Sequence, residues 1–212
     1  MASSNRKDLI VLVPGKDEAA VIRGILARRR ALGIRSVNAE IQFHPDRDPG
    51  CRLRAHDFLR RESGRFEHAL VLFDSEGCGA EDQTRHELES EVEQRLSTAG
   101  WGDRAAVVVI EPELEAWVWS DTPHVDEALG WKDKRPSLRE WLISEGFLAE
   151  DDTKPGRPKE AMEKALRLAR KKRSSAVYGQ LAKRVSFQRC TDPSFLRLRQ
   201  VLAGWFAEDT RL

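Results

Sequence analysis

Short, uninterrupted apolar runs are the feature that most limits how this chain can fold. Residues 9–13 (LIVLV), 68–73 (HALVLF) and 105–110 (AAVVVI) are almost entirely apolar. Runs without polar alternation are typical of strands that are buried on both faces of a parallel sheet. A further strand is expected at residues 38–43, although polar side chains interrupt its apolar pattern.

Segments with helical spacing separate these expected strands. Their apolar residues recur at intervals of three and four, which places them along one face of a helix. This alternation predicts an α/β fold, a parallel sheet with helices on its faces, because parallel neighbours need such crossovers. The helices expected here cover residues 17–33, 51–61 and 88–100, and residues 44–51 (HPDRDPGC) are expected to be a loop.

The pattern changes after about residue 120. No convincing strand follows, and residues 137–143, 159–172 and 195–206 have helical periodicity. We therefore expect residues 1–120 to form the α/β domain and residues 121–212 to form a helical appendage that packs on it.

Charge is distributed unevenly along the chain. The formal net charge is +1, but residues 154–190 contain twelve Lys or Arg and only two acids, Glu160 and Glu163. The rest of the chain is therefore net acidic. This division suits a protein that holds a cation in one place and a polyanion in another. It equally suits a soluble protein with a charged surface.

Neither a signal peptide nor a membrane span is expected, because no long apolar stretch follows the N-terminal residues MASSNRKD. The three cysteines, Cys51, Cys78 and Cys190, lack the close pairs of a zinc site and the even number of a disulfide framework. We expect a cytoplasmic protein with free thiols.

Acidic residues follow the expected strands at the points where ligands gather in a parallel sheet. Asp74 and Glu76 come directly after the run that ends at Phe73, and a Gly-Cys-Gly turn lies beyond them. Two carboxylates that face one pocket repel each other, so they need a cation or a retained proton. Mg²⁺ or Mn²⁺ is the oxygen-seeking cation usual in nucleic-acid enzymes. The alternative is a solvated turn without a ligand.

Two further segments place acids at strand ends. Glu113 and Glu115 follow the strand expected at residues 105–110, although acids in a first helical turn also favour the helix dipole. Residues 44–48 (HPDRD) follow the second expected strand. They either contribute to a metal site or form an ordinary polar turn, and the spacing leaves both alternatives open.

The motifs VPGKDE and FDSEGCG, over roughly residues 8–120, resemble the Toprim domain, a fold shared by topoisomerases, primases and overcoming-lysogenisation-defect nucleases. The later motifs PELEAWVW, KPGRPKEAMEKAL and RSSAVYGQLAKRVSF are more specifically similar to small Toprim-like proteins of bacterial defence islands. Among these, the chain most resembles the accessory Toprim-like proteins of the methylation-associated antiphage defence system.

The resemblance implies metal-dependent phosphodiester chemistry, but the chain departs from the family at one catalytic position. Toprim enzymes carry a glutamate at the end of the first strand, where this chain has Pro14. Glu18, one turn into the next helix, is a candidate to replace it. The resemblance implies Asp74, Glu76 and Glu115 as catalytic residues, and Asp74, Glu76 and Glu113 as metal ligands. Glu18 is added as a catalytic candidate because it lies one turn into the helix, although it does not match the family by position.

Basic residues of the later segment are candidates for contacts to nucleic-acid phosphates, which are electrostatic and independent of sequence. Two alternatives are a solvated helix face, and bases that fold over the acidic pocket and cancel its charge internally. The candidate residues are Lys154, Arg157, Lys159, Arg170, Lys171, Arg173, Lys183 and Arg184.

Together, these features lead us to expect a component of a bacterial antiphage defence system, with nucleic acid and other defence proteins as partners. The leading hypothesis is a Mg²⁺- or Mn²⁺-dependent nuclease or phosphodiester-processing subunit. A catalytically silent sensor or scaffold that binds nucleic acid or a partner protein is the alternative, because Pro14 cannot transfer a proton. A plain interaction module with a charged surface is the third hypothesis.

Overall fold

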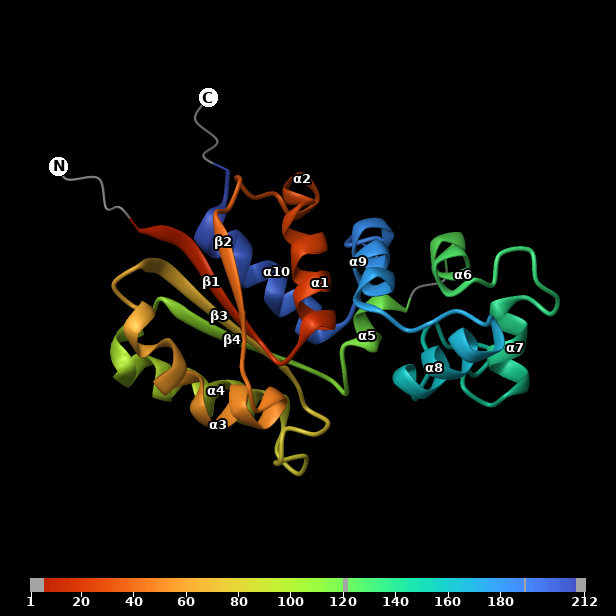
Figure 1. Ribbon diagram of the computed structural model, residues 1–212, viewed down its shortest axis with the longest axis horizontal. Coiled ribbons are helices and arrows are strands. Elements are labelled where there is room, and N and C mark those ends of the chain that lie inside the picture. The colour runs from red at the N-terminus through yellow and green to blue at the C-terminus, as the bar shows by residue number, and fades with distance from the viewer. Residues whose placement is uncertain (1–5, 120–121, 189, 209–212) are drawn as a thin grey trace.

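A single parallel sheet of four strands forms the centre of the protein. The computed structural model describes residues 6–119, 122–188 and 190–208. The strand order is β2–β1–β3–β4 and all neighbouring strands are parallel (Figure 1). The strands are β1 (Lys7–Val13), β2 (Ala39–Phe43), β3 (Phe66–Asp74) and β4 (Ala105–Ile110). The α/β class and the parallel sheet expected from the apolar runs are confirmed.

Helices cover both faces of this sheet, so two helical layers with the sheet between them make up three layers. The helices α3 (Arg47–Leu59) and α4 (Arg85–Leu96) lie on one face, and α1 (Lys16–Leu26) and α10 (Pro193–Phe206) lie on the other (Figure 1). Successive β1 residues face opposite layers. Leu9 and Val11 join the core with α1, whereas Ile10 and Leu12 join the core with α3. Burial on both faces is why β1 is apolar without alternation.

The remaining helices lie mainly in the C-terminal part of the chain, and they confirm its expected helical character. Two of them, α6 and α9, are not among the segments with recognised periodicity. The short α2 follows α1, η1 follows α3, and η2 is a π-helical turn after α4. The bounds are α2 (Arg29–Leu32), η1 (Arg60–Glu62), η2 (Ser97–Trp101), α5 (Glu115–Val118), α6 (Pro123–Leu129), α7 (Leu138–Ser144), α8 (Pro158–Leu168) and α9 (Ser175–Arg184).

The last helix, α10, returns from the appendage to the sheet. The Arg197 guanidinium donates to the Val107 carbonyl of β4 at 3.0 Å and pairs with Glu89 of α4 at 3.1 Å. The His68 ring of β3 stacks on Trp205 with 4.4 Å between ring centroids. The domain boundary at residue 120 stays a prediction, but α10, which lies within the predicted appendage, packs on the α/β body.

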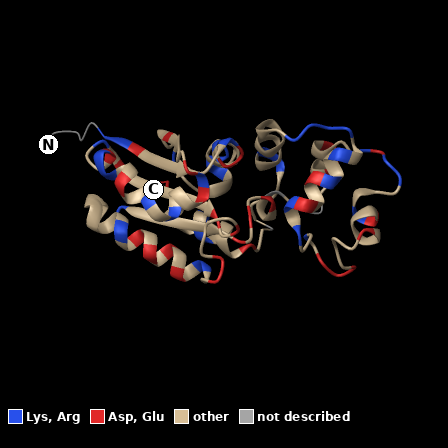
Figure 2. Ribbon diagram, turned by 60° about the horizontal axis from the view of Figure 1, so that its bottom comes forward, with Lys and Arg blue, Asp and Glu red and all other residues tan. Residues whose placement is uncertain are grey.

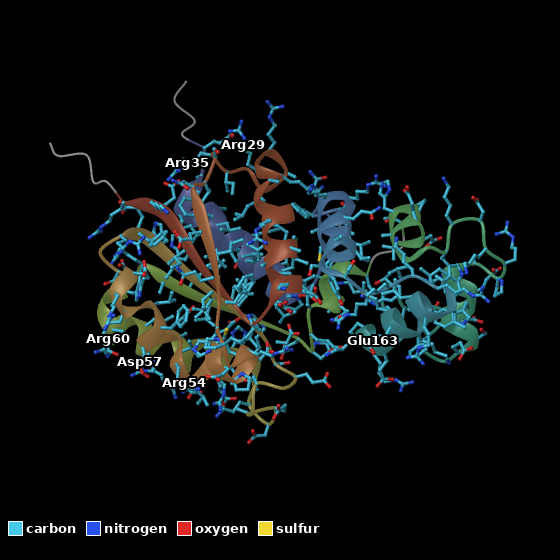
Figure 3. All side chains as sticks on the ribbon, viewed as in Figure 1. Arg29, Arg35, Arg54, Asp57, Arg60 and Glu163 are labelled. Atoms are coloured by element: carbon cyan, nitrogen blue, oxygen red, sulfur yellow. The ribbon has the colours of Figure 1, made fainter. Side chains whose placement is uncertain are left out.

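The loop predicted for residues 44–51 is shorter than expected, because α3 begins at Arg47. Pro49 lies in the first turn of this helix, where the backbone N–H groups have no helical partner, so a proline removes no hydrogen bond. Further along α3, Arg54 and Asp57 point away from the sheet, as does Arg60 at the start of η1 (Figure 3). The early start of α3 brings residue 48 close to the carboxyl end of the sheet.

Among the residues that the structure describes, no helix combines the length and the apolar character needed to cross a bilayer.

The contact between α1 and α9 depends on a missing side chain. A Cβ added to Gly24 would lie 2.8 Å from the Ala182 Cβ, closer than two carbon atoms approach. We expect Gly24→Ala to lower the free energy of unfolding by about 1–3 kcal/mol through overpacking. In the control Gly204→Ala in α10, the added Cβ would meet no neighbouring atom within 4 Å, so the free energy of unfolding should rise by up to about 1 kcal/mol through helix propensity. Urea unfolding of both variants measures the difference, and equal stabilities would contradict this close packing.

Candidate active site

Acidic side chains from four different segments meet at the carboxyl ends of the strands. Glu18 lies in the first turn of α1, Asp48 in the first turn of α3, Asp74 ends β3, and Glu115 begins α5. The strand order reverses between β1 and β3, since the chain moves from β1 out to β2 and then back to β3. Such a switch point is where open parallel sheets bind ligands. We call these four residues the acidic cluster.

Asp74 is at the centre of the acidic cluster. Its backbone N–H donates to Asp48 Oδ1 at 2.9 Å, and its own Oδ1 is buried without a hydrogen-bond partner among the described residues. Burial raises the pKa of Asp74 well above its usual range, and the charges of Asp48, Glu18 and Glu115 raise it further. A buried acceptor without a donor, surrounded by like charges, leaves a place for a proton or a cation.

Glu18 lies against the end of β1. A Cβ on Gly15 would be 3.0 Å from Glu18 Oε2, so the glycine leaves the space that this carboxylate occupies. Burial, with the charges of Asp48, Asp17 and Glu115, raises the pKa of Glu18 to about 7. An acid therefore lies beside the end of the first strand, next to Pro14.

Asp48 belongs to the acidic cluster, and the sequence had left open whether residues 44–48 contribute to a metal site or form an ordinary polar turn. Burial raises the pKa of its carboxyl group, while the Asp74 N–H and the charge of Lys159 oppose that shift. The signal in the sequence was an acid two residues into a helix that follows a parallel strand. The two prolines of that segment obscured the helix.

Glu115 differs from the other members because the appendage supplies it with donors. Its Oε1 accepts hydrogen bonds from the Tyr178 hydroxyl and, at 3.2 Å, from the Arg173 guanidinium. Arg173 also pairs with Asp17 of α1 at 3.2 Å. Burial still raises the pKa of Glu115, but the Tyr178 hydroxyl and Arg173 reduce that shift. Arg173 thus joins the appendage to the edge of the acidic cluster.

Two predicted metal ligands lie outside the acidic cluster. Glu113 is buried and accepts hydrogen bonds from the backbone N–H and the side-chain Nζ of Lys159, both at 3.0 Å. Glu76 is exposed in the loop after β3, and its N–H donates to the Pro112 carbonyl at 3.0 Å. The charges that act most strongly on Asp74 come from Asp48, Glu18 and Glu115, not from these two residues. Their roles as ligands stay predictions.

The candidate phosphate-binding residues divide into three groups. Lys159 and Arg173 fold over the acidic pocket, as one alternative from the sequence proposed. The side chains of four others bind partners within the appendage or in α5. Arg170 and Lys183 are exposed and have no side-chain partner among the described residues. The four occupied residues are Lys154 and Lys171, which donate to the carbonyls of Ala116 and Ala128, and Arg157 and Arg184, which pair with Glu160 and Glu127.

Acidic and basic positions are interspersed along both the α/β body and the appendage (Figure 2). Along the chain, however, residues 164–191 carry nine Lys or Arg and no Asp or Glu, so the basic excess is concentrated in this segment.

The donor chemistry of the acidic cluster fits a hard divalent cation, because carboxylate oxygens are the ligands that Mg²⁺ and Mn²⁺ prefer. The unpaired Asp74 Oδ1 is the acceptor best placed for such an ion. Within the described ranges, no group of three or more His, Cys, Asp or Glu side chains closes into a metal cage.

A separate hollow of about 400 Å³ lies beside α5 and contains no member of the acidic cluster. Four aromatic side chains, Trp117, Trp119, Phe187 and Phe195, contribute to its lining beside polar residues. The site is assigned to the acids because their geometry and raised pKa values suit chemistry, whereas this hollow has none of the acidic groups.

Comparison of the chain with protein-family models, with curated proteins and with solved structures finds no match.

Repulsion within the acidic cluster should make stability depend on pH. Glu18 keeps its proton up to a pKa of about 7 in the folded state, against 4.5 for the ordinary group, so the folded state binds more protons between these values. The free energy of unfolding therefore falls as pH rises through that range, by up to about 3 kcal/mol. Glu18→Gln should flatten this part of the profile and be more stable than wild type at pH 8. Urea unfolding from pH 4 to 8 checks this. If Glu18→Gln leaves the slope of the free energy of unfolding against pH unchanged, the pKa of Glu18 is not raised in the folded state.

Proposed function

We propose that the protein is a Toprim-like, divalent-metal-dependent nuclease or phosphodiester-processing subunit. The observation that carries the proposal is the Asp74 carboxyl at the switch point, with a buried, unpaired oxygen and three acids around it. Such pairs of repelling carboxylates at strand ends are typical of sites that take a cation and a phosphate. The all-parallel sheet with helices on both faces is compatible with the Toprim-like domain.

In this proposal Asp74, with Asp48 or Glu18, would hold one Mg²⁺ or Mn²⁺. When bound, the ion would supply Lewis acidity and a water of lowered pKa. The chain's own residues orient the substrate and move protons. Glu18, whose pKa is raised to about 7, is protonated in about half of the molecules at neutral pH and is the proposed general acid for the leaving oxygen. Lys159 and Arg173 contact the phosphates from the appendage side.

The biological setting of the proposal comes from the resemblance to Toprim-like proteins of defence islands. We propose that the chain acts in the bacterial cytoplasm as part of an antiphage system. Its substrate is nucleic acid, and other defence proteins are its partners. Arg170 and Lys183, exposed and without side-chain partners among the described residues, are the cations available for the backbone of a longer substrate.

A catalytically silent sensor or scaffold is the second candidate, and a specific observation favours it. Pro14 replaces the Toprim glutamate, and two cations of the appendage already pair with Glu113 and Glu115. In this alternative the pocket binds a nucleic-acid end or a partner protein without cleavage. The two candidates differ in whether the Glu18 carboxyl transfers a proton.

Metal binding is tested first, by calorimetric titration of the purified protein with Mn²⁺. We expect saturable binding to wild type and at least about tenfold weaker binding to Asp74→Asn, because the negative charge of the central carboxylate is lost. The control is Asp57→Asn on the outer face of α3, which should bind as wild type does (Figure 3). Glu76→Gln reports whether that exposed acid is also a ligand. A wild-type protein that does not bind Mn²⁺ contradicts the metal-dependent reaction.

Catalysis is tested separately, with single- and double-stranded DNA and RNA in the presence of Mn²⁺. We expect cleavage by wild type and a loss of about 10²–10⁴-fold in rate for Glu18→Gln, the range typical of a general acid. Mn²⁺ binding should persist in this variant if Asp48 supplies the second ligand. Nucleic-acid binding without cleavage by wild type would favour the silent sensor.

A further inference from the structure

The two edge strands of the sheet, β4 and β2, differ in whether their outward backbone groups have hydrogen-bond partners. An edge strand presents unpaired N–H and C=O groups that can pair with another strand. On β4 these groups are occupied by side chains. The Val107 N–H donates to Glu93 at 2.9 Å, the Val109 N–H donates to Glu89 at 3.2 Å, and the Val107 carbonyl accepts from Arg197 at 3.0 Å. This edge is therefore closed to another chain.

The β2 edge has no such cover. The Asn38 carbonyl accepts from the Leu9 N–H at 3.3 Å, and the His44 N–H donates to the Val13 carbonyl at 3.0 Å, so even-numbered residues face β1. In a parallel ladder the backbone groups of the alternate residues Ala39, Ile41 and Phe43 then face outward. Within the described part of the chain, no donor or acceptor meets these outward groups. Every residue of β2 is at least partly exposed.

The sequence of β2 is self-complementary in one antiparallel register. We propose that this edge pairs with β2 of a second copy, with Ile41 opposite Ile41 on a twofold axis. Ala39 then faces Phe43 of the other copy. Hydrogen-bonded pairs in an antiparallel ladder recur every second residue, so the three outward-facing residues of each copy are the bonding ones. The pairing makes about six backbone hydrogen bonds, two for each pair.

Side-chain size and charge support the same register. Phe43 is a large apolar residue with 42% of its surface exposed, and its opposite neighbour is the small Ala39. The ring would lie beside a hollow between α1 and β2, which is lined by Leu26, Val37, Ala39 and Ile41 together with Arg23. Glu40 faces Gln42 of the other copy, so no like charges are opposed. If the register between the two copies shifted by one residue, outward-facing backbone groups of one β2 strand would lie opposite groups of the other that already face β1.

The mass of the full chain in solution is the first test. Light scattering at tens of micromolar should give twice the chain mass of 24.1 kDa. Ile41→Pro removes an outward N–H without removing a bond to β1, so folding should persist while dimerisation weakens by about 100-fold or more. Ile41→Val is the matched control and should remain dimeric. A cooperative thermal unfolding transition is the check that both variants are folded. A monomeric wild type, or an Ile41→Pro dimer, overturns the proposal.

The register has its own test, which does not depend on the stability of the proline variant. Hydrogen-bonded antiparallel neighbours have Cα atoms about 5.5 Å apart, within the range that a disulfide spans. In a Cys190→Ser background, Ile41→Cys should therefore oxidise to a covalent dimer. Gln42→Cys, whose two copies lie farther apart in this register, should remain reduced. Efficient cross-linking of the Gln42→Cys variant, or none of the Ile41→Cys variant, overturns the assigned pairing.

Discussion

The burial of three neighbouring carboxyl groups, Glu18, Asp48 and Asp74, is the constraint around which the rest of the molecule is arranged. Burial disfavours ionisation of each, and the charge of Asp48 adds to this effect at Glu18 and Asp74, as the charge of Glu18 does at Asp74. Such an arrangement lowers stability, and a fold retains it where the charges have a use. The sheet positions these acids, because each lies at the end of a strand or in the helix that follows one.

The appendage supplies the opposite charge. Arg173 pairs with Asp17 and Glu115, and Lys159 pairs with Glu113, so the later part of the chain meets the acids of the α/β body. These ion pairs are partly buried, where a charge left without its partner is destabilising. The same two cations are suitably placed to contact phosphate, so a single set of contacts links the folding of the appendage with the proposed site.

The sequence predicted the α/β body well because the apolar runs of β1, β3 and β4 follow directly from burial on both faces. It predicted less of the appendage. The α9 segment, with Gly179 close to Ala20 of α1 and two cations at its end, has no apolar stripe as clear as that of α8. The start of α3 was missed because Pro49 usually marks a loop, whereas a first helical turn accepts it. The return of α10 to the sheet depends on contacts distant in sequence, such as Arg197 with β4.

For the site, the sequence by itself determined that acids follow buried parallel strands, and that Asp74 is the acid at the end of β3. Only the tertiary structure decided which acids meet. Asp48 and Glu18 reach Asp74, while Glu113 turns to Lys159 and Glu76 remains in solvent. The physical reason is that strand ends converge according to the order of strands in the sheet, which local spacing does not encode. Burial then acts on the pKa of each carboxyl according to its neighbours in space, not in sequence.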